Sequence, residues 1–279
     1  MTSRPDPKPF AFGNHRPEKR ALPFLWIVRI GLARGELSRG LRRLWMRWFD
    51  HVVDVEARGI RYRLNIGDNV TDAKILLSSK KYDQTELEHL ARACSGGTFV
   101  DIGANTGYYS LQVAASGARQ VLAIEPNPPT FERLAFNINC NPFAKTVRAL
   151  KLAIGPKGRA ALHQTQTLGS ASLIKMDPHE TGATEVESSP LLDVLGAEGI
   201  TQIDGLKIDI EGYEYQALEP FFRDAPRSLY PRCMVVEKCH EHTWEQDVID
   251  LLRAHGYTVT AQTRSNAILH REESSPTND

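Results

Sequence analysis

The residues most able to do chemistry begin with an acid, Asp101, which closes an apolar segment and precedes a glycine-rich turn. Gly103, Asn105 and Gly107 follow at alternate positions. Glycine lets the backbone approach a ligand closely, and asparagine tolerates a positive φ better than most residues. The spacing is not the Gly-x-Gly-x-x-Gly of dinucleotide-binding turns, which receive a pyrophosphate at a helix N-terminus. Because an acid at position 101 would repel a pyrophosphate, the turn favours a ligand with a positive charge.

A second acid, Glu125, closes the next predicted strand eighteen residues after Gly107. An acid at the end of this strand can accept hydrogen bonds from both hydroxyls of a ribose. Asn127 is placed to cap the following helix, and Pro128 to occupy its first turn. A nucleoside with a positive centre and no phosphate describes S-adenosylmethionine. The two turns together therefore predict this cofactor.

Three charged residues, Lys207, Asp209 and Glu211, alternate with isoleucines at the end of a later predicted strand. Buried charge is costly unless it is paired, so the pattern indicates either a site or an ion pair. In the structural interpretation, Lys207 pairs with one of the two acids. In the functional interpretation, the carboxylates position a substrate hydroxyl, one of them as general base. A metal site that includes Glu237 is a further interpretation.

A Cys-His-Glu-His run, residues 239–242, follows the fifth predicted strand of the sheet. It lacks the paired Cys-x-x-Cys spacing of zinc sites, so we expect no metal ion. His240 or His242 could instead accept a proton, because the loop borders the same cleft and histidine titrates near neutral pH. We take Asp209, Glu211 and His240, in that order, as candidate catalytic residues.

These residues follow predicted strands that alternate with helices. The expected strands cover 98–102, 120–125, 147–154, 204–210, 232–238, 257–262 and 266–271. The expected helices cover 107–116, 128–139, 190–197, 213–223 and 243–255, with a hairpin and irregular chain in 156–188. Alternation at this spacing indicates an α/β fold with a parallel sheet covered by helices on both faces. Ligands bind beyond the carboxyl ends of such strands.

The composition excludes several classes of protein. The chain has 279 residues, 41% of them hydrophobic, and 34 basic residues balance 34 acids. This balance excludes general disorder and argues against a nucleic-acid-binding protein. Four cysteines in so long a chain are no disulfide framework, so we expect a cytoplasmic protein.

The net charge of zero combines two opposite parts. Residues 1–50 hold eleven basic and four acidic residues, a charge of +7, and the remaining chain carries −7. The apolar run from Leu22 is too short to span a membrane, and no signal cleavage site follows it. A basic amphipathic helix is predicted from the spacing of Leu37, Leu41, Leu44, Trp45 and Trp48. We expect this helix to pack on the following domain; the alternatives are a partner protein and peripheral contact of residues 22–48 with the inner face of a membrane.

The sequence thus predicts three segments. Residues 1–50 form a basic arm with the amphipathic helix. Residues 51–97 form a two-stranded preamble, which turns at Gly59, and a helix capped by Asp83. Residues 98–279 form the main α/β domain.

With these motifs in place, the chain resembles the FkbM family of S-adenosylmethionine-dependent methyltransferases. The resemblance is carried, in order over about residues 98–270, by Val100-Asp-Ile-Gly-Ala-Asn-Thr-Gly-Tyr, Glu125-Pro-Asn, Asn137, Asn139 to Asn141, Ala153-Ile-Gly, Leu192-Asp-Val-Leu, Lys207-Ile-Asp-Ile-Glu-Gly, Glu237 and Ser265-Asn-Ala-Ile-Leu. It implies a Rossmann-like class I methyltransferase fold with a mostly parallel seven-stranded sheet whose last strand is antiparallel. It also implies methyl transfer, usually to an oxygen of a sugar, glycan or natural product.

The resemblance also implies roles for single residues. The methionine moiety of the cofactor would be held by Asp101, Gly103, Asn105 and Gly107. Glu125 would bind the ribose, while Asp209 and Glu211 would face the reacting end. We therefore count Asp209 both as a cofactor-binding and as a candidate catalytic residue.

Two other functions compete with methyl transfer to a small molecule or glycan. A nicotinamide-dependent oxidoreductase is disfavoured by the missing third glycine and by Asp101. A non-catalytic module could keep the fold as a scaffold attached to a membrane or a partner, but the intact cofactor acids argue against it.

Overall fold

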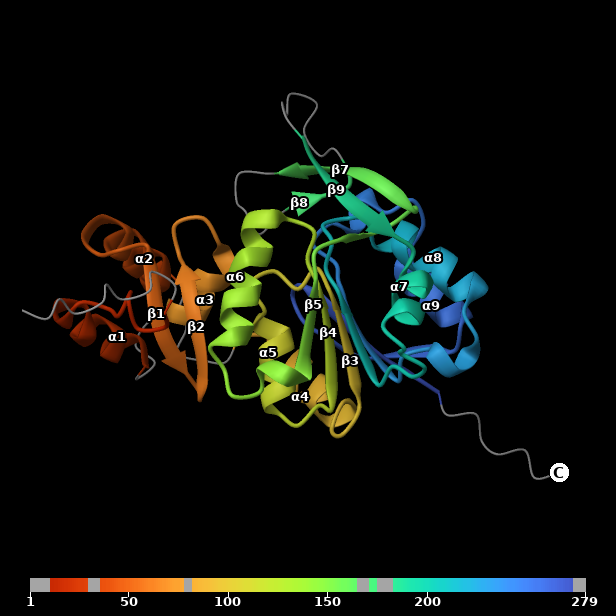
Figure 1. Ribbon diagram of the computed structural model, residues 1–279, viewed down its shortest axis with the longest axis horizontal. Helices are drawn as coiled ribbons and strands as arrows, with labels where there is room; N and C mark the ends of the chain where they lie inside the picture. Colours follow the sequence, from red (N-terminus) through yellow and green to blue (C-terminus); the bar gives the residue numbers. More distant parts are fainter. Residues whose placement is uncertain (1–10, 30–35, 78–81, 165–170, 175–182, 273–279) are drawn as a thin grey trace, which may run out of the picture. The chain divides into compact units, whose positions relative to one another are not determined.

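The computed structural model describes residues 11–29, 36–77, 82–164, 171–174 and 183–272. The chain divides into two compact units (Figure 1). The first contains Met1–Tyr82 and Asn139–Pro142, and the second Asp83–Ile138 and Phe143–Asp279. The second unit includes the helix expected at 83–94, which the sequence-based division placed with the preceding segment.

The first unit combines helices with a β-hairpin. Its elements are η1 (Lys19–Ala21), α1 (Leu22–Arg29), α2 (Glu36–Trp48), β1 (Val52–Ala57), β2 (Ile60–Asn65) and α3 (Val70–Leu77). The predicted amphipathic helix is present as α2. The hairpin turns through Arg58 and Gly59, whose φ angles of 56° and 78° suit a tight two-residue connection. Arg63 pairs with the buried Asp54 across the hairpin at 2.7 Å.

The second unit is built on a seven-stranded sheet in the order β12-β13-β11-β10-β3-β4-β5. Its strands are β3 (Thr98–Ile102), β4 (Gln120–Ile124), β5 (Val147–Leu150), β10 (Gly205–Ile208), β11 (Cys233–Glu237), β12 (Tyr257–Gln262) and β13 (Asn266–Arg271). β13 is antiparallel to both of its neighbours, and the remaining strands run parallel. This order and direction confirm the predicted class I methyltransferase fold.

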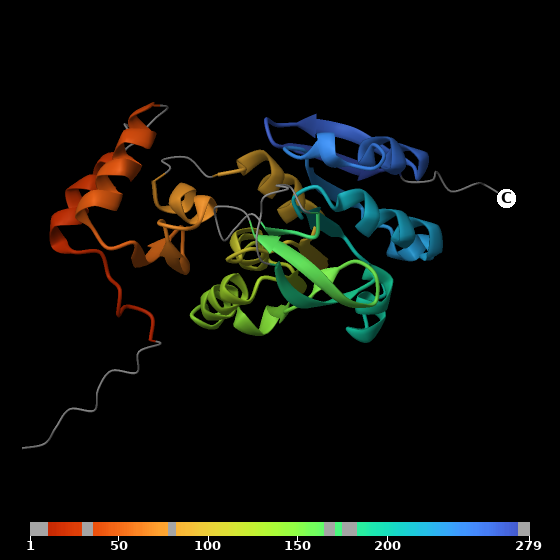
Figure 2. The same ribbon diagram turned by 90° about the horizontal axis from the view of Figure 1, so that it is seen from above.

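Helices cover both faces of this sheet (Figures 1 and 2). One face carries α4 (Gln84–Ala93), α5 (Tyr108–Ala115) and α6 (Pro128–Asn139), and the other carries α7 (Leu191–Ala197), α8 (Glu214–Asp224) and α9 (Val248–Ala254). Because both faces are covered, every residue of β3, β10 and β11 is buried. The resulting core is rigid enough to hold the turns at the strand ends in place.

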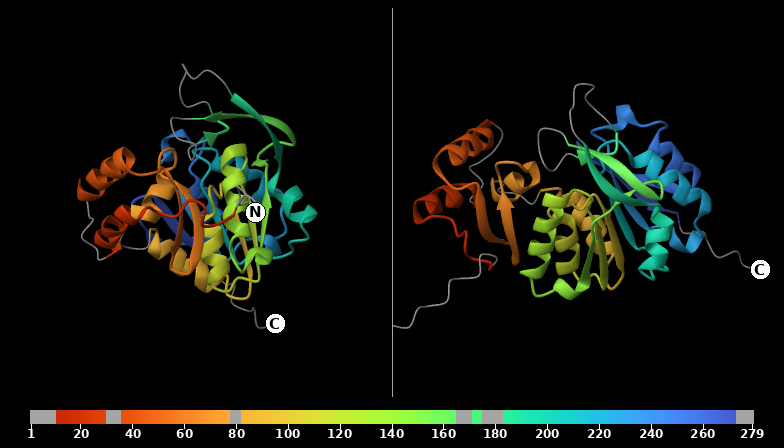
Figure 3. Two further views of the ribbon diagram at one scale, coloured as in Figure 1. Left: turned by 60° about the vertical axis from the view of Figure 1, so that its left-hand side comes forward. Right: turned by 45° about the horizontal axis from the view of Figure 1, so that its top comes forward.

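A smaller sheet occupies much of the stretch expected to be irregular (Figure 3). It has the order β6-β9-β7-β8, with β6 (Ala153–Ile154), β7 (Gly158–Gln164), β8 (Ala171–Ser172) and β9 (Ala183–Ser189). The predicted hairpin is the antiparallel pair β7 and β9. The single strand expected at 147–154 is wrong, because the chain leaves the edge of the large sheet after Leu150 and pairs with β9 instead. Part of the predicted excursion, 165–170 and 175–182, lies outside the described residues.

Two expectations about helix ends are also wrong. The helix expected at 243–255 is a 3-10 turn, η4 (Glu241–Thr243), followed by α9, because Asp247 accepts the amide of Ile249 at 2.7 Å and starts a new helix there. Asp83 precedes α4 but its side chain makes no capping hydrogen bond; it accepts the hydroxyl of Tyr109 at 2.7 Å instead. Across the described helices, none combines the length and the apolar character that a membrane crossing requires.

Candidate functional site

The predicted site residues lie at one edge of the seven-stranded sheet. β3 stands between β10 and β4, and all three strands are parallel. Asp101 is in register with Lys207, and Ile102 with Ile124. The turns after these strands therefore meet beyond their carboxyl ends, where α/β sheets bind ligands.

The turn after β3 is shaped by three residues with positive φ: Gly103 at 78°, Asn105 at 52° and Gly107 at 96°. A Cβ at Gly103 would overlap the carbonyl oxygen of Asp209, so only glycine lets the two turns approach this closely. A Cβ at Gly107 would lie 2.8 Å from Leu134 Cδ1, so this glycine also allows α5 and α6 to pack. The predicted conformational roles of the three residues are present in the turn.

Glu125 joins the first two turns through its carboxylate. Oε2 accepts the backbone amide of Asn105 at 2.8 Å, and Oε1 accepts that of Asn127 at 2.9 Å. The side chain is buried, and this desolvation raises the pKa of Glu125 to about 7 although both amide hydrogen bonds oppose the shift. Each carboxylate oxygen has a second acceptor position for a ligand hydroxyl.

Asp101 and Lys207 are buried residues in register on the adjacent strands β3 and β10. Asp101 Oδ2 accepts the hydroxyl of Ser110 at 2.6 Å, whereas Oδ1 has no hydrogen-bond partner within the described parts of the chain. Burial raises the pKa of Asp101, and the charge of Lys207 opposes that shift. Lys207 Nζ donates to Asp209 Oδ2 at 2.9 Å and lies 4.9 Å from the centre of the Tyr109 ring. Lys207 therefore forms the ion pair with Asp209 that the structural interpretation predicted, and this pair lies within the site.

The turn after β10 is held by an acid that the sequence-based reasoning missed. Glu214 Oε1 accepts the amides of Ile210 and Gly212 at 2.9 and 3.3 Å, and Oε2 accepts Trp244 Nε1 at 2.7 Å. Glu211 between them has a φ of 55°, which is uncommon for a side chain of this kind. An acid at the start of the helix predicted at 213–223 is a recognisable capping pattern, so this role was open to prediction.

His240 lies beside Glu211. Its Nδ1 is 2.9 Å from Glu211 Oε2 and 3.8 Å from Glu237 Oε2. Although the shorter distance is within hydrogen-bonding range, Nδ1 has no hydrogen-bond partner among the described residues. Burial raises the pKa of Glu237, and the charge of Asp209 raises it further. The structure thus brings the three candidate catalytic residues together, while His242 is exposed with its ring 6.2 Å from that of His240.

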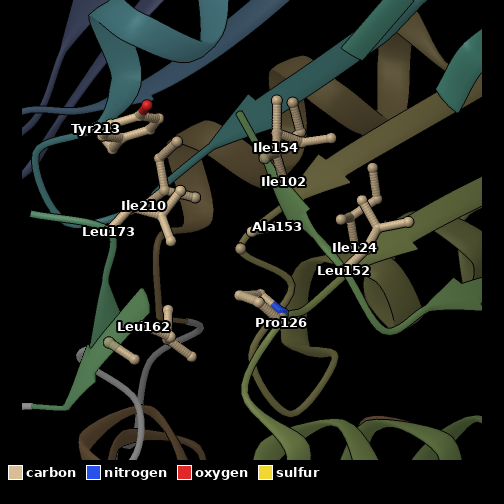
Figure 4. Close-up of a pocket in the computed structure, with 12 residues that line it drawn as sticks. Ile102, Ile124, Pro126, Leu152, Ala153, Ile154, Leu162, Leu173, Ile210 and Tyr213 are labelled. Atoms are coloured by element: carbon tan, nitrogen blue, oxygen red, sulfur yellow. The ribbon is translucent and has the colours of Figure 1, made fainter. Parts of the chain in front are cut away.

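Two adjoining pockets open at this edge. The polar pocket, of about 370 Å³, is lined by Gly103, Asn105, Glu125, Asp209 and Glu211 among others. The apolar pocket, of about 300 Å³, is lined by side chains of both sheets, such as Ile124 and Leu162, and by Leu152, Leu173 and Tyr213 from the segments between strands and helices (Figure 4). They share Gly103, Pro126, Ala171 and Ile210, so they form two halves of one cleft. In the described chain, no three His, Cys, Asp or Glu side chains are arranged to hold a metal ion.

The model of the methyltransferase FkbM domain matches residues 101–259, which include every one of these site residues. The chain belongs to the FkbM methyltransferase family. This membership confirms the resemblance seen in the sequence and agrees with the predicted cofactor, S-adenosylmethionine. The sequence matches none of the curated proteins.

Solved structures of methyltransferases are similar to this FkbM-family chain at low identity. Methyltransferase FkbM from Methylobacillus flagellatus is 16% identical with a TM-score of 0.40, and the match covers 62% of this chain and 43% of that one. The TYW2 protein of M. jannaschii, crystallised with AdoMet, is 13% identical with a TM-score of 0.39, covering 80% and 88%. Precorrin-6y C5,15-methyltransferase from Geobacter metallireducens is 14% identical with a TM-score of 0.41, covering 69% and 90%.

Proposed function

We propose that this chain transfers a methyl group from S-adenosylmethionine to a hydroxyl oxygen. The observation that carries the proposal is the pair of buried acids Asp101 and Glu125. Asp101 lies in β3, and Glu125 follows the adjacent strand β4 and lines the polar half of the cleft. In a nicotinamide-binding turn, a third glycine would stand where a pyrophosphate is received, and Asp101 would repel that group.

The residues present fit the cofactor. Asp101 Oδ1 is a buried acceptor that no described residue of the chain satisfies, and such atoms are rare without a ligand or water. The carboxylates of Glu125, Asp209 and Glu211 border the polar pocket, with Lys207 as the cation beside them, so the site favours a positively charged ligand. When bound, S-adenosylmethionine supplies an electrophilic methyl group.

Each half of the cleft has its own role in binding. The two oxygens of Glu125 are the acceptors for the ribose hydroxyls, since the amides of Asn105 and Asn127 already orient them. The apolar half offers aliphatic side chains, Ile124 and Leu152 among them, for the flat face of a base. The backbone at Gly103 can approach the methionine moiety because it has no side chain.

The acceptor hydroxyl must lose its proton when the methyl group is transferred, and we propose His240 as the base that accepts this proton. Asp209 Oδ2 already accepts a hydrogen bond from Lys207 Nζ at 2.9 Å, so this oxygen is engaged within the site. His240 turns Nδ1 toward Glu211 and Glu237, so Nε2 is the atom available to accept a proton. The nearby carboxylate stabilises the imidazolium that forms, as in other acid–histidine pairs.

The acceptor is proposed as a hydroxyl of a sugar, glycan or natural product, the class that the family resemblance implies. Neutral hydroxyls suit a site whose charges are directed toward a cationic cofactor. Positioning of the two reactants supplies much of the rate in such an in-line displacement, and the base adds ~10²–10⁴-fold.

Calorimetry on the full chain tests the cofactor assignment. Wild-type protein should bind S-adenosylhomocysteine and not NADH, and Asp101→Asn should weaken binding at least about tenfold by removing the charge beside the unpartnered Oδ1. Glu132→Gln, a change to an exposed acid on α6, is the matched control. Binding of NADH, or wild-type affinity in Asp101→Asn, would overturn the assignment.

Transfer is tested separately with methyl-labelled cofactor and a panel of glycans and small hydroxylated molecules. Label on an oxygen of an acceptor supports the proposal. Cofactor binding without transfer to any member of the panel or to a cell lysate would favour the non-catalytic scaffold instead.

A further inference from the structure

The exposed large apolar side chains of the described chain are concentrated on one helical pair. Four of the five lie on α1 and α2 and are more than half exposed: Leu22 (54%), Trp26 (62%), Leu44 (53%) and Trp48 (57%). Within each helix the two residues are four positions apart, so they share one face. Two solvent-facing tryptophans on neighbouring short helices are unusual for a soluble surface.

These side chains are not needed to hold the two helices together. Trp45, on the inner side of α2, is fully buried, and its Nε1 donates to the carbonyl of Asp50 at 2.9 Å. Its ring centre lies 5.6 Å from that of Phe24 on α1 and 4.9 Å from that of Phe49. This aromatic cluster is the core of the helical pair, which leaves the outer residues available for another contact.

Two of the four exposed residues, Leu44 and Trp48, border a shallow groove between α1 and α2. It has a volume of about 860 Å³, and its walls are formed by Phe24 and Ile27 on one side and by Leu44 and Trp48 on the other. Arg20 stands at the rim, with its guanidinium 5.7 Å from the centre of the Phe49 ring. The groove is thus apolar inside, with the Arg20–Glu18 ion pair at its edge.

Basic side chains flank the same face of α2. Arg43 and Arg47 are exposed, one turn apart, and the guanidinium of Arg47 lies 5.8 Å from the centre of the Trp48 ring. The acid nearest in sequence to Arg20, Glu18, is paired with it at 2.6 Å. Residues 1–50 as a whole carry a charge of +7. Any surface that fits this face must therefore be apolar beneath and anionic around it.

We propose that the exposed apolar side chains of α1 and α2 dock on a membrane surface that contains anionic lipid. Tryptophan side chains favour the boundary between headgroups and acyl chains, and arginines beside them can reach lipid phosphates while their stems remain in apolar surroundings. The combination of apolar insertion and attraction to anionic headgroups is the pattern of interfacial helices. A second copy of the chain would bring two sets of arginines together, which disfavours self-association through this face.

Vesicle flotation with the full chain tests the docking. We expect binding to vesicles with 30% phosphatidylglycerol, and weaker binding to pure phosphatidylcholine. The double variant Trp26→Ala with Trp48→Ala should lower the partition coefficient at least about tenfold. The double variant Arg43→Gln with Arg47→Gln should lower it by about tenfold or more on anionic vesicles only. Quenching of tryptophan fluorescence by brominated lipid should occur in the wild type.

Two matched controls separate the face from general effects. Val70→Ala removes the fifth exposed apolar side chain, on α3 of the same unit, and Arg159→Gln with Arg253→Gln removes two exposed positive charges elsewhere. Both should bind vesicles like the wild type, and all variants should keep the wild-type melting temperature and affinity for S-adenosylhomocysteine. Three outcomes would each overturn the proposal. They are no vesicle binding by the wild type, unchanged binding in both test variants, and a dimer in sedimentation that becomes monomeric in the Trp double variant.

Discussion

The backbone amide of Asn105 donates a 2.8 Å hydrogen bond to Glu125 Oε2, across twenty residues of sequence and between the turns of two adjacent strands. The carboxylate accepts the amide of Asn127 in the same way. One side chain thereby fixes both turns that border the polar half of the cleft. Its replacement should affect ligand binding and the turns together.

Glu125→Gln should weaken binding of S-adenosylhomocysteine at least about tenfold. The amide group of Gln would face one backbone N–H with its own donor, and a buried donor left unpaired costs roughly 1–3 kcal/mol. Calorimetry measures the affinity, with Glu132→Gln as control. Equal affinities of wild type and variant would show that Glu125 has no part in binding the ribose.

The pH dependence of stability should also change in Glu125→Gln. Burial raises the pKa of Glu125 to about 7, so the folded chain keeps a proton that the unfolded chain releases at lower pH. The stabilisation from this protonated carboxyl is present below the unfolded pKa, near 4.5, and is lost as pH rises through about 7. Denaturant unfolding from pH 4.5 to 8 measures the difference between wild type and variant. A difference that does not vary with pH would contradict the raised pKa.

His240→Gln should lower kcat by about 10²-fold or more and leave the affinity for S-adenosylhomocysteine unchanged. Glu211→Gln should lower kcat less, since it acts through the orientation and charge of His240. Initial rates with the acceptor found in the panel measure both effects. His242→Gln, two residues away and exposed, is the control. If His242→Gln and His240→Gln have equal rates, His240 is not the base.

Glu214→Ala should lower the free energy of unfolding by about 2–4 kcal/mol, because it leaves two buried amides and Trp244 Nε1 without their acceptor. Glu245→Gln, an exposed acid next to Trp244, should change it little. Denaturant unfolding measures both. The double variant Glu214→Ala with Trp244→Phe should lose less free energy of unfolding than the sum of the losses in the two single variants, because both changes remove the same hydrogen bond. If the two losses of unfolding free energy are strictly additive, the hydrogen bond between Trp244 and Glu214 does not contribute to stability.

Gly103→Ala should cost several kcal/mol of stability, roughly 2–4, and abolish cofactor binding. The new Cβ meets the backbone oxygen of Asp209 and forces the turns after β3 and β10 apart. Gly96→Ala, with a φ of 69° and no atom near its Cβ position, isolates the backbone cost of about 1 kcal/mol. Similar melting temperatures for the two variants would show that close approach of the turns is not required.

The sequence by itself determined the α/β alternation, the strands that carry Asp101 and precede Glu125, and the amphipathic α2. These features depend on local periodicity and on turn chemistry, which are properties of short segments. The family was predictable for the same reason, because the motifs that carry it are contiguous runs.

Only the tertiary structure decided which charged groups meet. The order of residues does not determine that Lys207 meets Asp209, or that His240 meets Glu211. It also leaves undetermined the hydrogen bonds that Glu214 accepts and the second sheet, formed by β6 to β9. Periodicity predicts where a strand ends, but a contact within 3 Å depends on how several turns pack at one sheet edge. For the same reason, only the tertiary structure shows that Trp45 is buried in the core whereas Trp26 and Trp48 are exposed.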